Sequence, residues 1–180
     1  METGSQEREE FNGTVRQLRE EDIPALRKIS EHWLEDGGII AYDEVEGDMD
    51  TLRHSLNPDS GKTIFVAETR DGQVVGMMGL NANPKKDLLP FAKTDDPSEL
   101  IVAYVHPEYR GGKGAETALL GAAQDLVRKL NKAEILLESG PRHRETAYAF
   151  YDKQPGFSRA GIIKDFYGPG LDTVVWQKTF

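Results

Sequence analysis

The 180-residue sequence predicts a single α/β or α+β domain built around a mixed β-sheet. Three observations predict this class. Short apolar runs rich in β-branched residues alternate with segments whose apolar residues recur at helical spacing. One such run, residues 100–105, leads through a glycine cluster into an amphipathic segment, as in a strand–loop–helix unit. Asp71-Gly72 separates two further runs, which indicates a hairpin.

The first third of the domain is expected to hold one strand and two helices. Residues 14–18 alternate polar and apolar side chains, as a strand with one buried face does. Asp22 stands where a helix N-cap is preferred, and Gly37-Gly38 stands where a helix would end. A weaker helix is expected over residues 48–56, inside a strongly acidic stretch.

The remaining elements follow in chain order. Residues 63–69 and 73–80 are expected to pair as antiparallel neighbours, and the proline-rich residues 81–98 to form a long loop or lid. Beyond the glycine cluster and its helix, strands are expected over residues 134–138, 157–163 and 173–178, with a helix over residues 144–154.

Composition narrows the class of function. The 22 Lys and Arg against 31 Asp and Glu give a net charge of −9, which disfavours nucleic acid and anionic membranes as partners. The absence of cysteine excludes disulfides, thiolate metal sites and a cysteine nucleophile. The four histidines show no ligand spacing, so no metal is expected.

The distribution of apolar residues predicts where the protein is located and how its domain is organised. No apolar run approaches the roughly 18 residues of a membrane span, and the N-terminus lacks the apolar region of a secretion signal. We therefore expect a cytoplasmic protein. Residues 1–12 are expected to form a flexible polar tail, and residues 13–180 a single domain.

The glycine cluster, Gly111, Gly112 and Gly114 with the cations Arg110 and Lys113, joins a strand end to a helix start. A helix N-terminus presents unpaired N–H groups and a partial positive charge, so this junction suits a phosphate. The two cations add charge-assisted donors. A tight turn with solvated cations is the alternative interpretation of these residues alone.

Neither of two common nucleotide-binding motifs is present. Gly61-Lys62-Thr63 matches the end of a Walker motif, but Leu56 stands where its first glycine belongs. The GxGxxG spacing of dinucleotide-binding folds is broken after Gly112.

The segment VHPEYRGGKGAETALL, residues 105–120, resembles the acetyl-CoA loop of the GCN5-related N-acetyltransferase (GNAT) superfamily. That loop runs from a strand through V-x-P-x-x-R-G-x-G-x-G into a helix. A second similarity is Phe150-Tyr151 ahead of Gly156-Phe157, where the family has an aromatic-tyrosine pair before Gly-Phe. The resemblance covers nearly the whole chain. Two departures are Glu116, where Gly or Ala is usual, and Pro155, which looks inserted after the tyrosine.

This resemblance implies a GNAT-like acyl-CoA N-acyltransferase fold, with a central, mostly antiparallel sheet flanked by helices. It also implies that amides of residues 111–115 cradle the diphosphate of acetyl-CoA while the pantetheine runs along the strand ending at Val105. The residues expected to bind this co-substrate are Tyr104, Val105, His106, Arg110, Gly111, Gly112, Lys113, Gly114, Ala115, Glu116, Arg144 and Tyr151.

Acetyl transfer to an amine needs a neutral amine, a stabilised oxyanion and a proton for the leaving thiolate. Because the chain has no cysteine and no GxSxG elbow, direct attack in a ternary complex is expected. The resemblance puts the Tyr151 hydroxyl near the sulfur as the acid; a purely structural tyrosine is the alternative. Glu99, at a strand start where several family members carry a base, and Glu138, at the end of the neighbouring strand, are the candidate bases.

The acceptor side is expected to lie near the acidic stretch, with Tyr42, Asp43 and Glu44 as candidate binding residues. Such a cluster attracts a cationic amine, although a solvated loop has the same composition. The predicted function is N-acetylation of a primary amine of a small molecule or peptide by a monomer or homodimer. The alternatives are a non-catalytic module that binds CoA or a protein partner, and a phosphate-binding module for another nucleotide.

Overall fold

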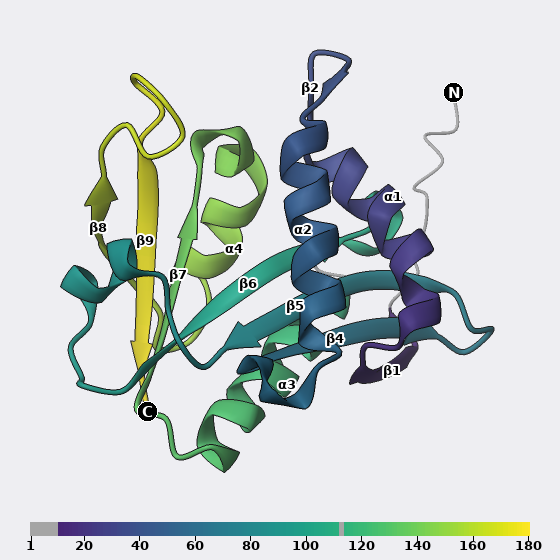
Figure 1. Ribbon diagram of the computed structural model, residues 1–180, viewed down its shortest axis with the longest axis horizontal. Coiled ribbons are helices and arrows are strands. Elements are labelled where there is room, and N and C mark those ends of the chain that lie inside the picture. Colours follow the sequence, from purple (N-terminus) through teal and green to yellow (C-terminus); the bar gives the residue numbers. More distant parts are fainter. Residues whose placement is uncertain (1–10, 112–113) are drawn as a thin grey trace, which may run out of the picture.

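The computed structural model describes residues 11–111 and 114–180 (Figure 1). Within these residues a seven-stranded sheet has the order β1-β4-β5-β6-β7-β9-β8. In that spatial order the strands are β1 (Gly13–Gln17), β4 (Lys62–Thr69), β5 (Val74–Asn81), β6 (Pro97–Val105), β7 (Glu134–Ser139), β9 (Thr173–Thr179) and β8 (Ser158–Ile163). Only the β6–β7 pair is parallel among these neighbours, so the mixed and mostly antiparallel sheet is confirmed.

Helices cover both faces of this sheet, and each face has its own core (Figure 1). Leu26, Met49 and Ile64 belong to the core on the face of α1 and α2, whereas Leu119 and Trp176 belong to the core on the face of α3 and α4. The helices are α1 (Ile23–Trp33), α2 (Tyr42–Ser55), α3 (Ala115–Lys129) and α4 (Ala149–Asp152), the last preceded by a π-helical turn η6 (Arg144–Tyr148).

The end of α1 differs from the sequence prediction. The helix stops at Trp33, ahead of Gly37 and Gly38, which turn a small hairpin of β2 (Glu35–Asp36) and β3 (Ile39–Ile40). Both glycines have positive φ, +59° and +83°, a conformation that helix ends and tight hairpins use equally.

Helix α2 begins at Tyr42, earlier than the residue 48 expected. Its buried residues Val45, Met49 and Leu52 lie four and three positions apart, so they form one apolar stripe against the sheet. The acidic residues between them occupy the other faces of the helix, which masked this stripe in the sequence.

The connection between β5 and β6 packs against the sheet as a strap. It contains the 3₁₀ helix η3 (Lys86–Phe91), whose Leu88 is fully buried with Leu136 and Val175. The carboxylate of Glu134 accepts backbone N–H groups from residues 93 and 94 of the strap. The segment expected to be a long loop or lid is therefore fastened to the core.

The parallel strands β6 and β7 pair over residues 97–99 and 134–136. Farther along, Val102 of β6 has φ of +44°, and the register between β5 and β6 shifts between Met77 and Gly79. These are the marks of a β-bulge, which bends and twists a strand. The bend follows the short paired segment, so β6 and β7 separate towards their carboxyl ends.

Candidate active site

A cavity of about 820 Å³ opens where β6 and β7 separate. Its lining includes Tyr104 from β6, Glu138 from β7 and Tyr151 from α4. Asp48 from α2 and Arg142 from the 3₁₀ turn η5 (Pro141–His143) complete it on another side. Because Tyr151 belongs to the core on one face of the sheet and Tyr104 packs against the core on the other, the cavity is lined from both faces.

Lys85 joins the two carboxylates that the sequence suggested as bases. Its Nζ lies 3.1 Å from Glu99 Oε1 and 3.0 Å from Glu138 Oε1, and its backbone N–H donates to Glu99 Oε2 at 3.0 Å. Glu138 also accepts hydrogen bonds from the hydroxyls of Tyr167 and Thr173, each at 2.8 Å. Burial alone would lower the pKa of Lys85, but Glu138 and Glu99 outweigh it and raise that pKa.

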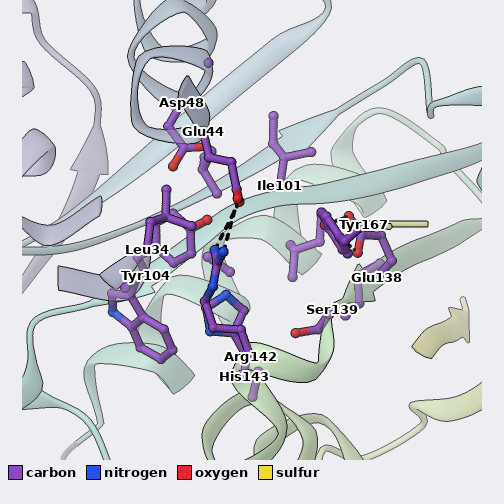
Figure 2. Close-up of a pocket in the computed structure, with 18 of the residues that line it drawn as sticks. Leu34, Glu44, Asp48, Ile101, Tyr104, Glu138, Ser139, Arg142, His143 and Tyr167 are labelled. Atoms are coloured by element: carbon purple, nitrogen blue, oxygen red, sulfur yellow. Dashed lines mark hydrogen bonds and ion pairs between the residues drawn. The ribbon is translucent and has the colours of Figure 1, made fainter. Parts of the chain in front are cut away.

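Two further carboxylates reach the cavity from α2 (Figure 2). Glu44 forms a two-pronged ion pair with Arg142, with both N···O distances 3.1 Å, across 98 positions of sequence. Asp48 accepts a hydrogen bond from Ser30 Oγ at 2.6 Å. Burial, assisted by Glu44, raises the pKa of Asp48 to about 6 even though the bond from Ser30 lowers it.

An aromatic wall stands beside these charges. Trp33 stacks on Tyr104 with ring centroids 5.7 Å apart and meets His143 edge-on at 5.3 Å. Its indole N–H donates to the Val105 carbonyl at 2.8 Å, and the Arg110 guanidinium lies 4.9 Å from its ring centroid. Burial, with the nearby Arg142, lowers the pKa of His143 to about 4, so its imidazole is neutral at neutral pH.

Tyr151 enters the cavity from the other face. Its ring is buried among Phe150, Phe157 and Trp176, with centroids 5.1, 6.1 and 5.7 Å away. Burial, and then the charge of Glu116, raises the pKa of Tyr151 above its usual range. The hydroxyl is therefore protonated at neutral pH.

The described glycines of the cluster, Gly111 and Gly114, have left-handed backbone geometry at the start of α3. Gly111 and Gly114 have φ of +79° and +98°, and Gly114 is the N-cap of α3. The Gly111 N–H donates to Glu116 Oε1 at 3.0 Å, and a side chain added at Gly111 would meet nothing within 4 Å. A backbone with positive φ at the start of a helix suits an anionic group such as a diphosphate, which would have to replace Glu116 as the acceptor of the Gly111 N–H. Gly112 and Lys113 lie outside the described residues.

The other candidates divide between the cavity and its surroundings. Of the three acceptor-binding candidates, Glu44 lines the cavity, whereas Tyr42 and Asp43 are exposed on the first turn of α2 outside its lining. Arg144 borders a separate shallow hollow with Asp152. The backbone N–H of His106 donates to Val75 of β5 at 2.7 Å.

Several residues of the cavity were not assigned a role from the sequence. Asp48 belongs to the acidic stretch expected near the acceptor, but no individual role was given to it, although it lies one helical turn beyond Glu44. Lys85, Arg142 and Tyr167 come from connecting segments, where no periodic pattern reveals which side chains turn inward.

The described part of the chain has neither a metal-binding cluster nor a membrane-spanning helix. No three His, Asp or Glu side chains among residues 11–111 and 114–180 are grouped so as to hold a metal ion. In the same residues no helix has the length and apolar character needed to cross a membrane.

A family model and the similar solved structures all point to acetyltransferases. The family model described as "Acetyltransferase (GNAT) family" matches residues 17–157. No curated protein matches the chain significantly. Among solved structures, the ribosomal-protein-alanine N-acetyltransferase of Brucella melitensis is 26% identical, with a TM-score of 0.69 over 93% of this chain and 99% of that one.

Two more distant structures share the fold. A phosphinothricin acetyltransferase of Sinorhizobium meliloti, in complex with AcCoA, is 24% identical, with a TM-score of 0.69 over 94% of this chain and 89% of that one. The spermidine/spermine N-acetyltransferase SpeG of Vibrio cholerae is 17% identical, with a TM-score of 0.62 over 93% of this chain and 92% of that one. The family model matches most of the chain, and the structure has the separating strands β6 and β7 and a helix, α3, that begins at a glycine N-cap. This chain therefore belongs to the GNAT acetyltransferase family.

Proposed function

We propose that this protein transfers the acetyl group of acetyl-CoA to a primary amine by direct attack in a ternary complex. The observation that carries the proposal is the cavity between β6 and β7, which is lined by residues from both faces of the sheet. A thioester arriving from the α3 and α4 face and an amine arriving from the α1 and α2 face can meet there without exchanging places.

The donor side is assigned to the helix start and to Tyr151. The amide of Gly114, and that of Gly111 once it exchanges Glu116 for the ligand, offer the diphosphate hydrogen bonds. The Arg110 guanidinium adds positive charge on a chain whose net charge is −9. The solved complex of the Sinorhizobium protein with AcCoA supports this choice of donor. Tyr151 is the proposed acid: its buried, protonated hydroxyl gives a proton to the leaving thiolate.

The acceptor side is assigned to the acidic wall. Among the described residues that line the cavity, five are carboxylates and three are Lys or Arg, and His143 is neutral. The excess negative charge favours an acceptor that arrives as a cation, which an amine does. The lining carboxylates are Asp36, Glu44, Asp48, Glu99 and Glu138.

An acetylation assay tests the proposal. Purified protein is incubated with acetyl-CoA and a panel containing a polyamine, an amino sugar, an amino acid and a lysine-rich peptide, and release of CoA thiol is followed. We expect turnover with at least one cationic amine and intersecting initial-velocity lines. Parallel lines would contradict direct attack, because they indicate a covalent acyl-enzyme.

Ligand stabilisation separates the remaining alternatives. A ligand present at 100 times its dissociation constant adds about 2.7 kcal/mol to the free energy of unfolding. Stabilisation by acetyl-CoA without its consumption would identify a binding module. Stabilisation by ATP or NAD instead of acetyl-CoA would identify a site for another nucleotide.

A further inference from the structure

Asp48 accepts a hydrogen bond from a buried side chain of the neighbouring helix. Ser30 on α1 is fully buried, and its hydroxyl donates to Asp48 Oδ2 at 2.6 Å. Figure 2 shows the Asp48 side chain directed from α2 into the cavity, beside the ring of Tyr104. The bond to Ser30 fixes one oxygen of this carboxylate to α1 while Asp48 lines the cavity.

The surroundings of Asp48 combine burial with charges of both signs. Glu44 lies one turn earlier on α2, and the titratable groups that line the cavity also include Tyr104 of β6, Arg142 and His143 of η5, and Lys62 of β4. Burial is the main reason that the pKa of Asp48 rises to about 6; Glu44 adds to the rise, while Ser30 and Tyr104 oppose it. A base of this strength is ionised at neutral pH and is matched to proton transfer there.

The other two central carboxylates are engaged. Glu99 accepts from the side chain of Lys85 at one oxygen and from its backbone N–H at the other. Glu138 accepts from Lys85, Tyr167 and Thr173. These contacts tie both carboxylates to the strap and to the β8–β9 connection, whereas no ion pair of Asp48 is found among the described residues.

We propose that Asp48 is the base that takes the proton from the acceptor amine. This inference rests on the proposed acetyl transfer. The bound ammonium first releases one proton to water. As the N–C bond forms and the C–S bond breaks, a second proton passes from nitrogen to Asp48 while Tyr151 gives its proton to sulfur. Asp48 then releases its proton, and Tyr151 regains one through water, so one proton is released per turnover.

The first test compares two matched substitutions on the same helix. Asp48→Asn keeps the shape and the bond to Ser30 but cannot take a proton, and we expect kcat to fall by at least about 100-fold with acetyl-CoA affinity unchanged. Asp50→Asn is the control, because Asp50 is exposed and pairs with Arg53 at 3.1 Å, outside the cavity. Turnover of the Asp48 variant within about threefold of wild type would overturn the inference.

The second test uses the pH dependence of kcat/KM. The wild type is expected to lose activity below an apparent pKa of about 6, and Asp48→Asn to lose this limb. Ser30→Ala keeps the base but removes a bond that lowers its pKa, so the limb should move to higher pH. A limb that stays in place in Ser30→Ala, or that disappears in Glu138→Gln, would overturn the inference.

The two proposals fail differently. If the wild type acetylates no amine on the panel, the acetyl-transfer function fails and the role of Asp48 fails with it. If the wild type acetylates an amine and Asp48→Asn does so equally well, only the role of Asp48 fails. Calorimetric acetyl-CoA binding and a thermal melt of each variant separate a lost base from a lost fold.

Discussion

Tyr151 combines burial with access to the cavity, and this combination makes its hydroxyl informative. Its side chain is 5% exposed, yet it lines the cavity. Tyr151→Phe removes one oxygen from a ring that three aromatic neighbours already hold. We expect kcat to fall at least about tenfold with little change in acetyl-CoA affinity, measured by steady-state kinetics and calorimetry.

Tyr148 supplies the control for this prediction. It is equally buried, but its hydroxyl donates to the Ser139 carbonyl at 3.1 Å. Tyr148→Phe should therefore lose about 1 kcal/mol of unfolding free energy and leave kcat within about twofold. Equal losses of kcat in both variants would mean that the hydroxyl of Tyr151 acts through packing and not as an acid.

At the level of single residues, the sequence predicted what is local and missed what is distant. Tyr151 was selected because an aromatic pair and Gly-Phe, as in the family that the chain resembles, lie within a few positions of each other, and it lines the cavity. Arg142 was not, because its partner Glu44 is 98 positions away and only the folded sheet brings them together. Among Tyr42, Asp43 and Glu44, the one that faces the cavity depends on the phase of α2, which its acidic sequence concealed.

Among the elements, the start of α3 combines a glycine N-cap with Glu116, a residue that is unusual at this position in the family that the chain resembles. The Gly111 amide expected to meet the diphosphate instead donates to Glu116, one of the departures from the family pattern. Burial raises the pKa of Glu116, although the bond from Gly111 opposes the rise. An ionised Glu116 thus competes with a bound diphosphate for the same donor and repels its charge.

We therefore predict that Glu116→Gln tightens acetyl-CoA binding by about five- to tenfold, a gain of roughly 1 kcal/mol. Calorimetric titration at neutral pH measures it. Asp125→Asn is the matched control, because Asp125 is exposed near the far end of α3 and pairs with Arg128 at 2.9 Å. Weaker binding by the Glu116 variant would instead mean that this carboxylate organises the loop for the ligand.

The elements themselves were predicted unevenly, for physical reasons. The hairpin of β4 and β5 was correct because Asp71-Gly72 specifies a turn through local backbone geometry. The end of α1 was wrong because Gly37 and Gly38 supply a positive φ that a helix end and a hairpin turn both need. Nothing local distinguishes those uses; the pairing of β2 with β3 decides between them.

On the scale of the whole molecule, η5 links strand β7 to the helices α1 and α2, which pack on the other side of the cavity. It follows β7, yet Arg142 pairs with Glu44 of α2 and His143 packs on Trp33 of α1. The cavity is therefore bounded by contacts between segments that lie more than 90 positions apart. No reading of periodicity could supply them, although the family resemblance predicted the sheet that makes them possible.

The packing of His143 between η5 and α1 should make the stability of the fold depend on pH. Its pKa is lowered from 6.5 to about 4 in the fold, so the unfolded chain takes up the proton first. Above pH 6.5 the residue contributes no pH dependence, and between pH 6.5 and 4 it progressively destabilises the folded state. Asp48 acts in the opposite sense: its pKa is raised from 3.8 to about 6, so acidification through this range relieves its cost.

His143→Gln should consequently change the slope of stability against pH and not only its level. Between pH 7.5 and 4.5 we expect the variant to gain about 2 kcal/mol of unfolding free energy relative to the wild type, because the unfavourable protonation is gone while the gain from Asp48 remains. Urea unfolding at both pH values measures the difference, and Asp48→Asn should change it with the opposite sign. Parallel pH profiles for the wild type and His143→Gln would show that His143 is not the buried, neutral group that joins η5 to α1.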